Sequence, residues 1–144
     1  MSYGSNSLSN QRVVMQTIDY AQTLLPPNFI KIDVEGMELV VLKGGDATII
    51  KNRPILYVEN NGDKRFGEGT SESLIEYLWQ LDYRLYWHVS FYYNANKFFN
   101  NRDNIYGGQV ACNMICVPKE STLFLNEEEI KVKSNFPFNW RLLC

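Results

Sequence analysis

Two short apolar runs, each with an acidic residue at or next to its end, constrain the fold of this chain most strongly. The first run, residues 29–34, reads Phe-Ile-Lys-Ile-Asp-Val, and the second, residues 55–59, reads Ile-Leu-Tyr-Val-Glu. Residues 37–43 lie between them and have the apolar spacing of a helix. A strand, a helix and a second strand in this order form the unit that builds a parallel sheet with crossover helices. The sequence therefore predicts an α/β fold, and the nearly continuous second run predicts a strand covered on both faces.

Turn residues, helix caps and apolar spacing predict the remaining elements. Strands are expected at residues 13–18, 83–93 and 111–117, and helices at 19–25, 46–50, 71–81 and 127–133. Asp46 is expected to cap the helix at 46–50, and Thr70 or Ser71 the helix at 71–81. The helix at 37–43 is expected to carry on one face Met37, Val40 and Val41. The last two strands, joined by a loop, predict an antiparallel strand at one edge of the sheet.

The composition is typical of one globular domain. The chain has 144 residues, of which 45% are hydrophobic and 21% charged, and its net charge is −2. This length supports a substantial core, and so small a charge predicts no attraction to nucleic acid or to an anionic membrane. No apolar stretch has the length of a membrane span. Residues 1–12 are rich in Ser, Asn and Gly, and they are expected to form a flexible segment rather than a signal peptide.

The cysteines indicate a reducing compartment. The chain has three of them, Cys112, Cys116 and Cys144, and no Cys or His pair completes a zinc site. Cys112 and Cys116 lie in an apolar run and are expected to be buried in a strand, since free Cys behaves as a small hydrophobe. These features favour a cytoplasmic protein without a zinc site.

Polar residues at the ends of the two apolar runs are the main candidates for a functional site. Because ligands of open α/β sheets bind beyond the carboxyl ends of the strands, Asp33, Glu35, Glu59 and Asn60 are expected on one rim. Such a group could bind a hard cation, act as a base or hold a substrate amine. The alternative is that these acids face water near a helix N-terminus, where negative charge is favoured. Lys31 and Asp33 lie two apart and could form an ion pair, structural or catalytic.

His88 and the surrounding aromatic residues are weaker candidates. His88 is the only histidine and lies in the strand expected at residues 83–93, where it is either a general base or a hydrogen-bonded strand residue. The aromatic residues of the same strand could stack on sugars or bases, or form core on one side of the sheet.

Residues 27–45 together with residues 53–59 resemble the signature of the FkbM-type methyltransferases. The first segment contains Phe-Ile-Lys-Ile-Asp-Val-Glu-Gly followed by a helix, and the second reads Arg-Pro-Ile-Leu-Tyr-Val-Glu. Gly45 stands where the family pattern has Ala. Residues 13–19 and 113–118 are similar to further segments of the family, so the resemblance covers most of residues 13–118.

The resemblance implies methyl transfer from S-adenosylmethionine (SAM) to an acceptor oxygen, a hydroxyl of a sugar or secondary metabolite. It implies that Asp33 contacts the cofactor as well as the acceptor, and that Asp33, Glu35 and Glu59 form the catalytic group. Asn60 and His88 are then candidate substrate contacts, and Glu38 is expected to be a solvated helix residue. By analogy with catechol-type enzymes, the pair Glu59 and Asn60 could hold magnesium.

The sequence departs from the family at its N-terminal end. Residues 1–28 contain no glycine loop after an apolar strand and no acid to hold the ribose of SAM. Residues 13–144 are therefore expected to form a partial Rossmann-like class I methyltransferase domain, strands four to seven of the sheet, with an incomplete three-layer α/β/α arrangement. The chain could be a truncated reading frame, an expressed piece or half of a split enzyme.

An incomplete domain of this kind has two consequences. The chain alone is expected to bind SAM weakly, and its rival interpretation is a non-catalytic interaction module that needs a partner to complete the sheet. The strand at residues 29–34 is expected to be an exposed edge that joins two copies into a homodimer, unless residues 13–18 fold back and cover it.

Overall fold

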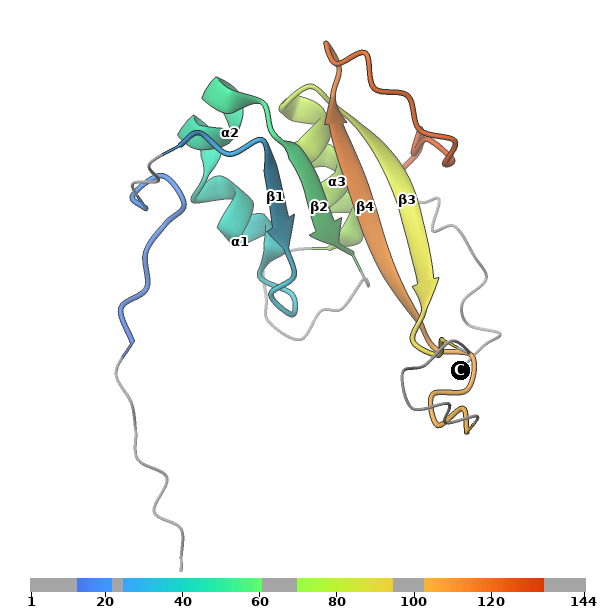
Figure 1. Cartoon of the computed structure of the whole chain (residues 1–144). Coiled ribbons are helices and arrows are strands. Elements are labelled where there is room, and N and C mark those ends of the chain that lie inside the picture. The colour runs from blue at the N-terminus through green and yellow to red at the C-terminus, as the bar shows by residue number, and fades with distance from the viewer. Residues whose placement is uncertain (1–12, 22–24, 61–69, 95–102, 134–144) are drawn as a thin grey trace, which may run out of the picture.

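A computed structural model describes residues 13–21, 25–60, 70–94 and 103–133. Its centre is a four-stranded sheet in the order β1-β2-β4-β3 (Figure 1). The strands are β1 (Phe29–Ile32), β2 (Ile55–Glu59), β3 (Tyr83–Phe91) and β4 (Val110–Pro118). β1 and β2 are parallel, whereas β4 runs antiparallel to both β2 and β3. The predicted α/β fold with an antiparallel pair at one edge is confirmed.

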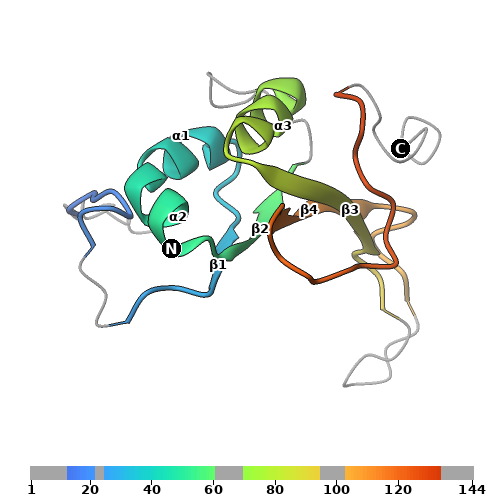
Figure 2. The ribbon, with the colours of Figure 1, turned by 90° about the horizontal axis from the view of Figure 1, so that it is seen from above.

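The three helices of the described residues lie on one face of the sheet, here called the helix face (Figure 2). They are α1 (Glu38–Lys43), α2 (Asp46–Asn52) and α3 (Ser71–Gln80). The core lies between them and the sheet and includes Leu42, Ile75 and Met114, none of which is exposed. Among the described residues no helix covers the opposite face, here called the open face. The prediction that β2 is covered on both faces is therefore wrong, because only alternate residues of β2 are fully buried.

The buried face of α1 differs from the prediction. Met37 and Val40 are 38% and 50% exposed, whereas Leu39 and Leu42 point into the core together with Glu38. Five apolar residues fall within residues 37–42, so spacing alone left the orientation of this helix ambiguous.

Residues 17–19 dock on the turn between α1 and α2. The Asp19 carboxylate accepts hydrogen bonds from the backbone N–H groups of Ala47 and Thr48, at 3.0 and 2.7 Å. It therefore satisfies the first turn of α2, and the prediction that Asp46 caps this helix is wrong: Gly45 is the N-cap, and no side chain of its own caps the helix. A Cβ atom at Gly45 would lie 3.1 Å from Ile18, so the alanine of the family pattern would require Ile18 to shift by a few tenths of an ångström.

The strand expected at residues 13–18 is absent from the structure. This segment has no regular secondary structure before a turn that begins at Ile18, and Val13, Val14 and Met15 are each at least 85% exposed. It does not pair with β1, because its anchored end is held at the α1–α2 turn instead. Within the described residues, β1 is hydrogen-bonded only to β2.

The opposite edge of the sheet is covered. The segment expected to be a helix, residues 127–133, is extended where it passes β3: Ile130 N donates to Leu85 O at 2.8 Å, and Trp87 N donates to Glu128 O at 3.3 Å. Ile130 is 3% exposed. Burial of this one apolar residue and pairing with β3 outweigh the helix propensity of the glutamates.

The helix expected at residues 19–25 is not found in the described part of that segment, where residues 18–20 form a turn; residues 22–24 lie outside the described residues. The remaining predicted strands and helices agree with the structure apart from their ends. The Thr70 hydroxyl accepts a hydrogen bond from Ser73 N and caps α3, as expected. Cys112 and Cys116 are buried free thiols in β4, also as expected, and burial raises the pKa of both. Residues 1–12 and Cys144 lie outside the described residues. No helix of the described part is long and apolar enough to cross a membrane.

Replacement of Asp19 tests its role as a remote cap of α2. Loss of a capping carboxylate costs about 1 kcal/mol, so Asp19→Ala is expected to lower the free energy of unfolding by this amount in urea denaturation. Gln16→Ala, in the exposed part of the same segment, is the control and should leave it unchanged. Equal stability of the two variants would contradict the assignment.

Candidate active site

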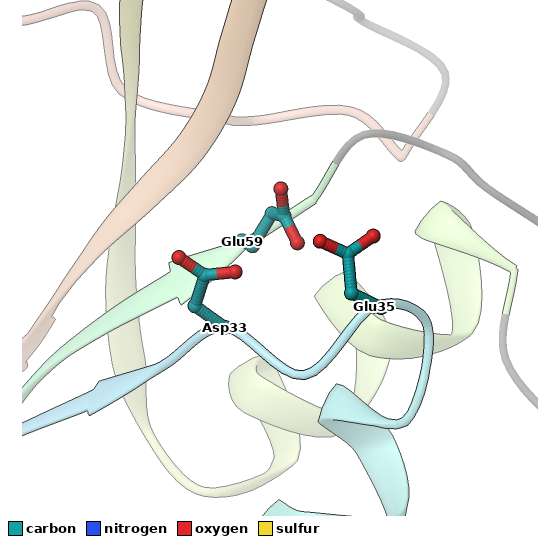
Figure 3. Close-up of side chains that lie close together, drawn as sticks. All are labelled: Asp33, Glu35 and Glu59. Atoms are coloured by element: carbon teal, nitrogen blue, oxygen red, sulfur yellow. The ribbon is translucent and has the colours of Figure 1, made fainter. Parts of the chain in front are cut away.

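Three carboxylates meet at the carboxyl ends of β1 and β2. Asp33 and Glu35 lie in the turn between β1 and α1, and Glu59 is the last residue of β2 (Figure 3). Each offers a carboxylate oxygen within 4.8 Å of the other two. The parallel pairing of β1 with β2 brings both strand ends to the same edge, so residues 26 apart along the chain, Asp33 and Glu59, become neighbours.

The turn that carries Asp33 and Glu35 is held by a buried glutamate. The Glu38 carboxylate accepts hydrogen bonds from the backbone N–H groups of Val34 and Gly36, at 3.2 and 3.1 Å. Glu38 is only 8% exposed, so the expectation that it is a solvated helix residue is wrong. The sequence did hold a signal for this role: Glu38 lies in the first turn of a helix, just after a glycine, where a carboxylate interacts favourably with free backbone N–H groups.

The backbone of this turn is strained at Glu35. Its φ is +54°, in the left-handed region that non-glycine residues seldom adopt, and Gly36 follows with φ +99°. Strain of this kind costs of order 1–3 kcal/mol and is concentrated at functional sites. Here it turns the Glu35 side chain back towards Glu59 (Figure 3).

The charges of the cluster are unequally compensated. Lys31 Nζ lies 2.9 Å from Asp33 Oδ2, which confirms the predicted ion pair. A hydrogen bond from the Lys31 ammonium lowers the pKa of Asp33. Burial, followed by the negative charges of Asp33 and Glu35, raises the pKa of Glu59 to about 7. Asp33 and Glu59 lie close enough to titrate together, and Glu59 gives up its proton only near neutral pH.

The other two predicted site residues do not join the carboxylates. Asn60 is 4% exposed, and its amide donates to the Met114 sulfur at 3.4 Å. His88 lies on β3, with Nδ1 2.8 Å from the Tyr57 hydroxyl. The substrate-binding roles assigned to Asn60 and His88 remain predictions.

Oxygen ligands in this arrangement are of the type that magnesium and calcium prefer. Asp33, however, is already paired with Lys31, and Glu59 with Asp33. The magnesium site therefore remains a prediction, and the chemistry most directly supported by the geometry is proton transfer.

In open α/β sheets, ligands bind beyond the carboxyl ends of the strands, and this is the edge at which the three carboxylates lie. A comparison with protein-family models matches residues 2–85 to the methyltransferase FkbM domain. The match covers more than half of the chain and includes all three clustered carboxylates. The chain therefore belongs to the FkbM methyltransferase domain family. Comparisons with curated proteins and with solved structures gave no match.

The raised pKa of Glu59 predicts an unusual pH dependence of stability. Between the ordinary value of 4.5 and about 7, the folded state holds the Glu59 proton and the unfolded state does not. The free energy of unfolding is therefore expected to decrease as pH rises through this window. The pKa of Asp33 is lowered from 3.8, so its ionisation changes the free energy of unfolding only at pH values below this window.

Glu59→Gln should remove this decrease and be more stable than the wild type at pH 8. Urea denaturation between pH 5 and pH 8 measures both effects, with Glu127→Gln as a matched exposed control. A wild-type stability that rises or stays level across the window would contradict the assignment.

Proposed function

We propose that this chain supplies the acceptor side of a SAM-dependent methyltransferase site that methylates a hydroxyl group. The observation that carries the proposal is the cluster of Asp33, Glu35 and Glu59, with carboxylate oxygens within 4.8 Å of one another, in a domain of the FkbM methyltransferase family. A carboxylate with a pKa of about 7 is suited to accept a proton at neutral pH.

SAM, when bound, supplies an electrophilic methyl group. The acceptor oxygen forms a bond to the methyl carbon as the carbon–sulfur bond breaks, and the acceptor loses its proton. Glu59 takes this proton in the proposed reaction. Asp33, oriented by Lys31, holds the acceptor hydroxyl, and its charge keeps the proton affinity of Glu59 high. Glu38 positions Asp33 and Glu35 through the turn that it fixes.

We further propose that binding of SAM needs a glycine loop from outside residues 1–28, since these residues contain none after an apolar strand. The isolated chain should then show no saturable binding of S-adenosylhomocysteine at micromolar concentration in calorimetry. Tight stoichiometric binding by this chain alone would refute this part of the proposal.

Methyl transfer itself is testable by complementation. The chain is mixed with a separate polypeptide that carries the glycine-loop half of an FkbM domain, together with SAM and a panel of hydroxyl acceptors. Acceptor-dependent formation of S-adenosylhomocysteine is expected, with a loss of about 10²-fold or more in Glu59→Gln, as is typical for removal of a general base. Glu127→Gln is the control. No turnover under any condition would favour the alternative, a non-catalytic interaction module.

We also propose that the outer edge of β1 pairs with a second copy of the chain. The carbonyl oxygen of Asn28 accepts a hydrogen bond from Ile55 N and therefore faces β2. Because successive residues of a strand alternate in direction, the backbone N–H and C=O groups of Lys31 and Asp33 face away from β2. A two-fold axis at Ile32 places Lys31 of each copy opposite Asp33 of the other, which is a favourable cross-strand pair. Phe29, 57% exposed at this edge, would be partly covered.

Lys31→Pro tests the edge without removing a hydrogen bond to β2, because proline is tolerated where the N–H faces outward. Light scattering at tens of micromolar should give the mass of a dimer for the wild type and of a monomer for Lys31→Pro. Lys31→Ala separates loss of the backbone donor from loss of the charge. A monomeric wild type, or a dimer that survives Lys31→Pro, would exclude pairing through β1.

A further inference from the structure

β3 and β4 continue the sheet beyond the carboxylate cluster (Figure 1). β2 ends at Glu59, whose register partner on β4 is Asn113. β3 and β4 stay paired past this position through Val89 and Cys112, Ser90 and Ala111, and Phe91 and Val110. Because β4 is antiparallel to both of its neighbours, β3 runs parallel to β2, and this extension lies at the edge of the three carboxylates. It is here called the β3–β4 arm, with residues 89–92 and 105–112.

The end of the arm carries a pair of half-exposed tyrosines. Tyr92 and Tyr106 are 49% and 43% exposed. Their ring centroids lie 6.0 Å apart at an interplanar angle of 63°, the edge-to-face arrangement that aromatic pairs favour. The backbone that carries them is held by hydrogen bonds: Tyr92 N donates to Gln109 O at 3.1 Å, and Tyr106 N donates to the Asn104 side chain at 3.0 Å. The two rings therefore form a preorganised aromatic surface.

This aromatic surface lies near the carboxylates. Burial, followed by the negative charges of Glu59, Glu35 and Asp33, raises the pKa of Tyr92. The Tyr92 hydroxyl is therefore within electrostatic range of the whole cluster. A flat ring that packs against the tyrosines has its edge on the side of the carboxylates.

We infer that Tyr92 and Tyr106 bind the aromatic ring of a phenolic acceptor, whose hydroxyl is directed to Glu59. This inference rests on the proposed function and names the substrate class of that same site.

The exposed rings favour an aromatic ligand. Aromatic rings attract one another in offset or edge-to-face contacts, because the negative face of one ring meets the positive edge of another. Burial of the exposed part of each tyrosine ring adds the hydrophobic contribution. A saturated ring of the same size gains the second contribution and not the first, so it is expected to bind more weakly.

The acidity of a phenol also suits the base at this site. The pKa of Glu59 is about 7, that of a phenol is about 10, and an aliphatic alcohol is about as weakly acidic as water, at about 16. Proton transfer to Glu59 is thus unfavourable by about three pKa units from a phenol and by about nine from an alcohol. In the reaction the phenol oxygen bonds to the methyl carbon as the carbon–sulfur bond of SAM breaks, and the phenolic proton passes to Glu59.

The test is a nuclear magnetic resonance titration of the full chain at pH 8 with phenol, and in parallel with cyclohexanol, a saturated ring with one hydroxyl. Phenol is expected to shift the ring signals of Tyr92 and Tyr106 saturably, together with the side-chain carboxyl signal of Glu59. Cyclohexanol should bind several-fold more weakly.

Tyr92→Leu should weaken phenol binding about two- to tenfold, the equivalent of the 0.5–1.5 kcal/mol that an aromatic pair contributes. Tyr92→Phe keeps the ring and should bind phenol as the wild type does. Tyr20→Leu removes another exposed tyrosine, on the turn that docks near α2, and serves as the matched control.

Equal affinity for phenol and cyclohexanol, unchanged phenol binding in Tyr92→Leu, or a phenol titration that leaves the Glu59 signal unmoved would overturn the inference. The titration needs no SAM, so its outcome is separate from that of methyl transfer. Phenol binding at Tyr92 and Glu59 without turnover on any acceptor would remove the proposed function and leave the binding site standing. Turnover on aliphatic alcohols by a chain that does not bind phenol would do the reverse.

Discussion

The two hydrogen bonds from Val34 N and Gly36 N to the Glu38 carboxylate determine the shape of the candidate site. They close the turn after β1 and start α1 at a fixed orientation, with Leu39 and Leu42 in the core. They also stabilise the backbone at Glu35, whose positive φ would otherwise be unfavourable. The position of Glu35 beside Glu59 follows from this turn, and without it one of the three carboxylates would be free to move away.

The two ends of the sheet differ in how their charges are compensated. At the end opposite the carboxylates, Arg53 forms two hydrogen bonds with Glu120 and donates to the carbonyl groups of Leu81 and Asp82. A second ion pair there, between Lys119 and Asp82, adds a further satisfied contact. The carboxylate end gathers like charges instead, and burial together with these charges raises the pKa of Glu59. Concentration of unfavourable electrostatics at one end, in a sheet stabilised at the other, is typical of a functional site.

The fold class and the three clustered acids could be predicted because they depend on local pattern. An apolar run with an acid at its end specifies a strand and the edge at which the acid lies, so Asp33 and Glu59 were expected together. The cap of α2 could not be predicted from local pattern. The Asp19 carboxylate accepts a hydrogen bond from the backbone N–H of Ala47, which lies 28 residues later in the chain. The orientation of α1 was missed because a continuous apolar segment has no unique face.

The central claim is that burial and the neighbouring charge of Asp33 raise the pKa of Glu59 to about 7. The most direct test is a ¹³C titration of the side-chain carboxyl carbons of both residues in the full chain. The account predicts a midpoint of about 7 for Glu59, with a second, smaller response of Asp33 over the same range, because the two groups titrate together. A Glu59 midpoint close to the ordinary 4.5, with no response of Asp33 near neutral pH, would contradict it.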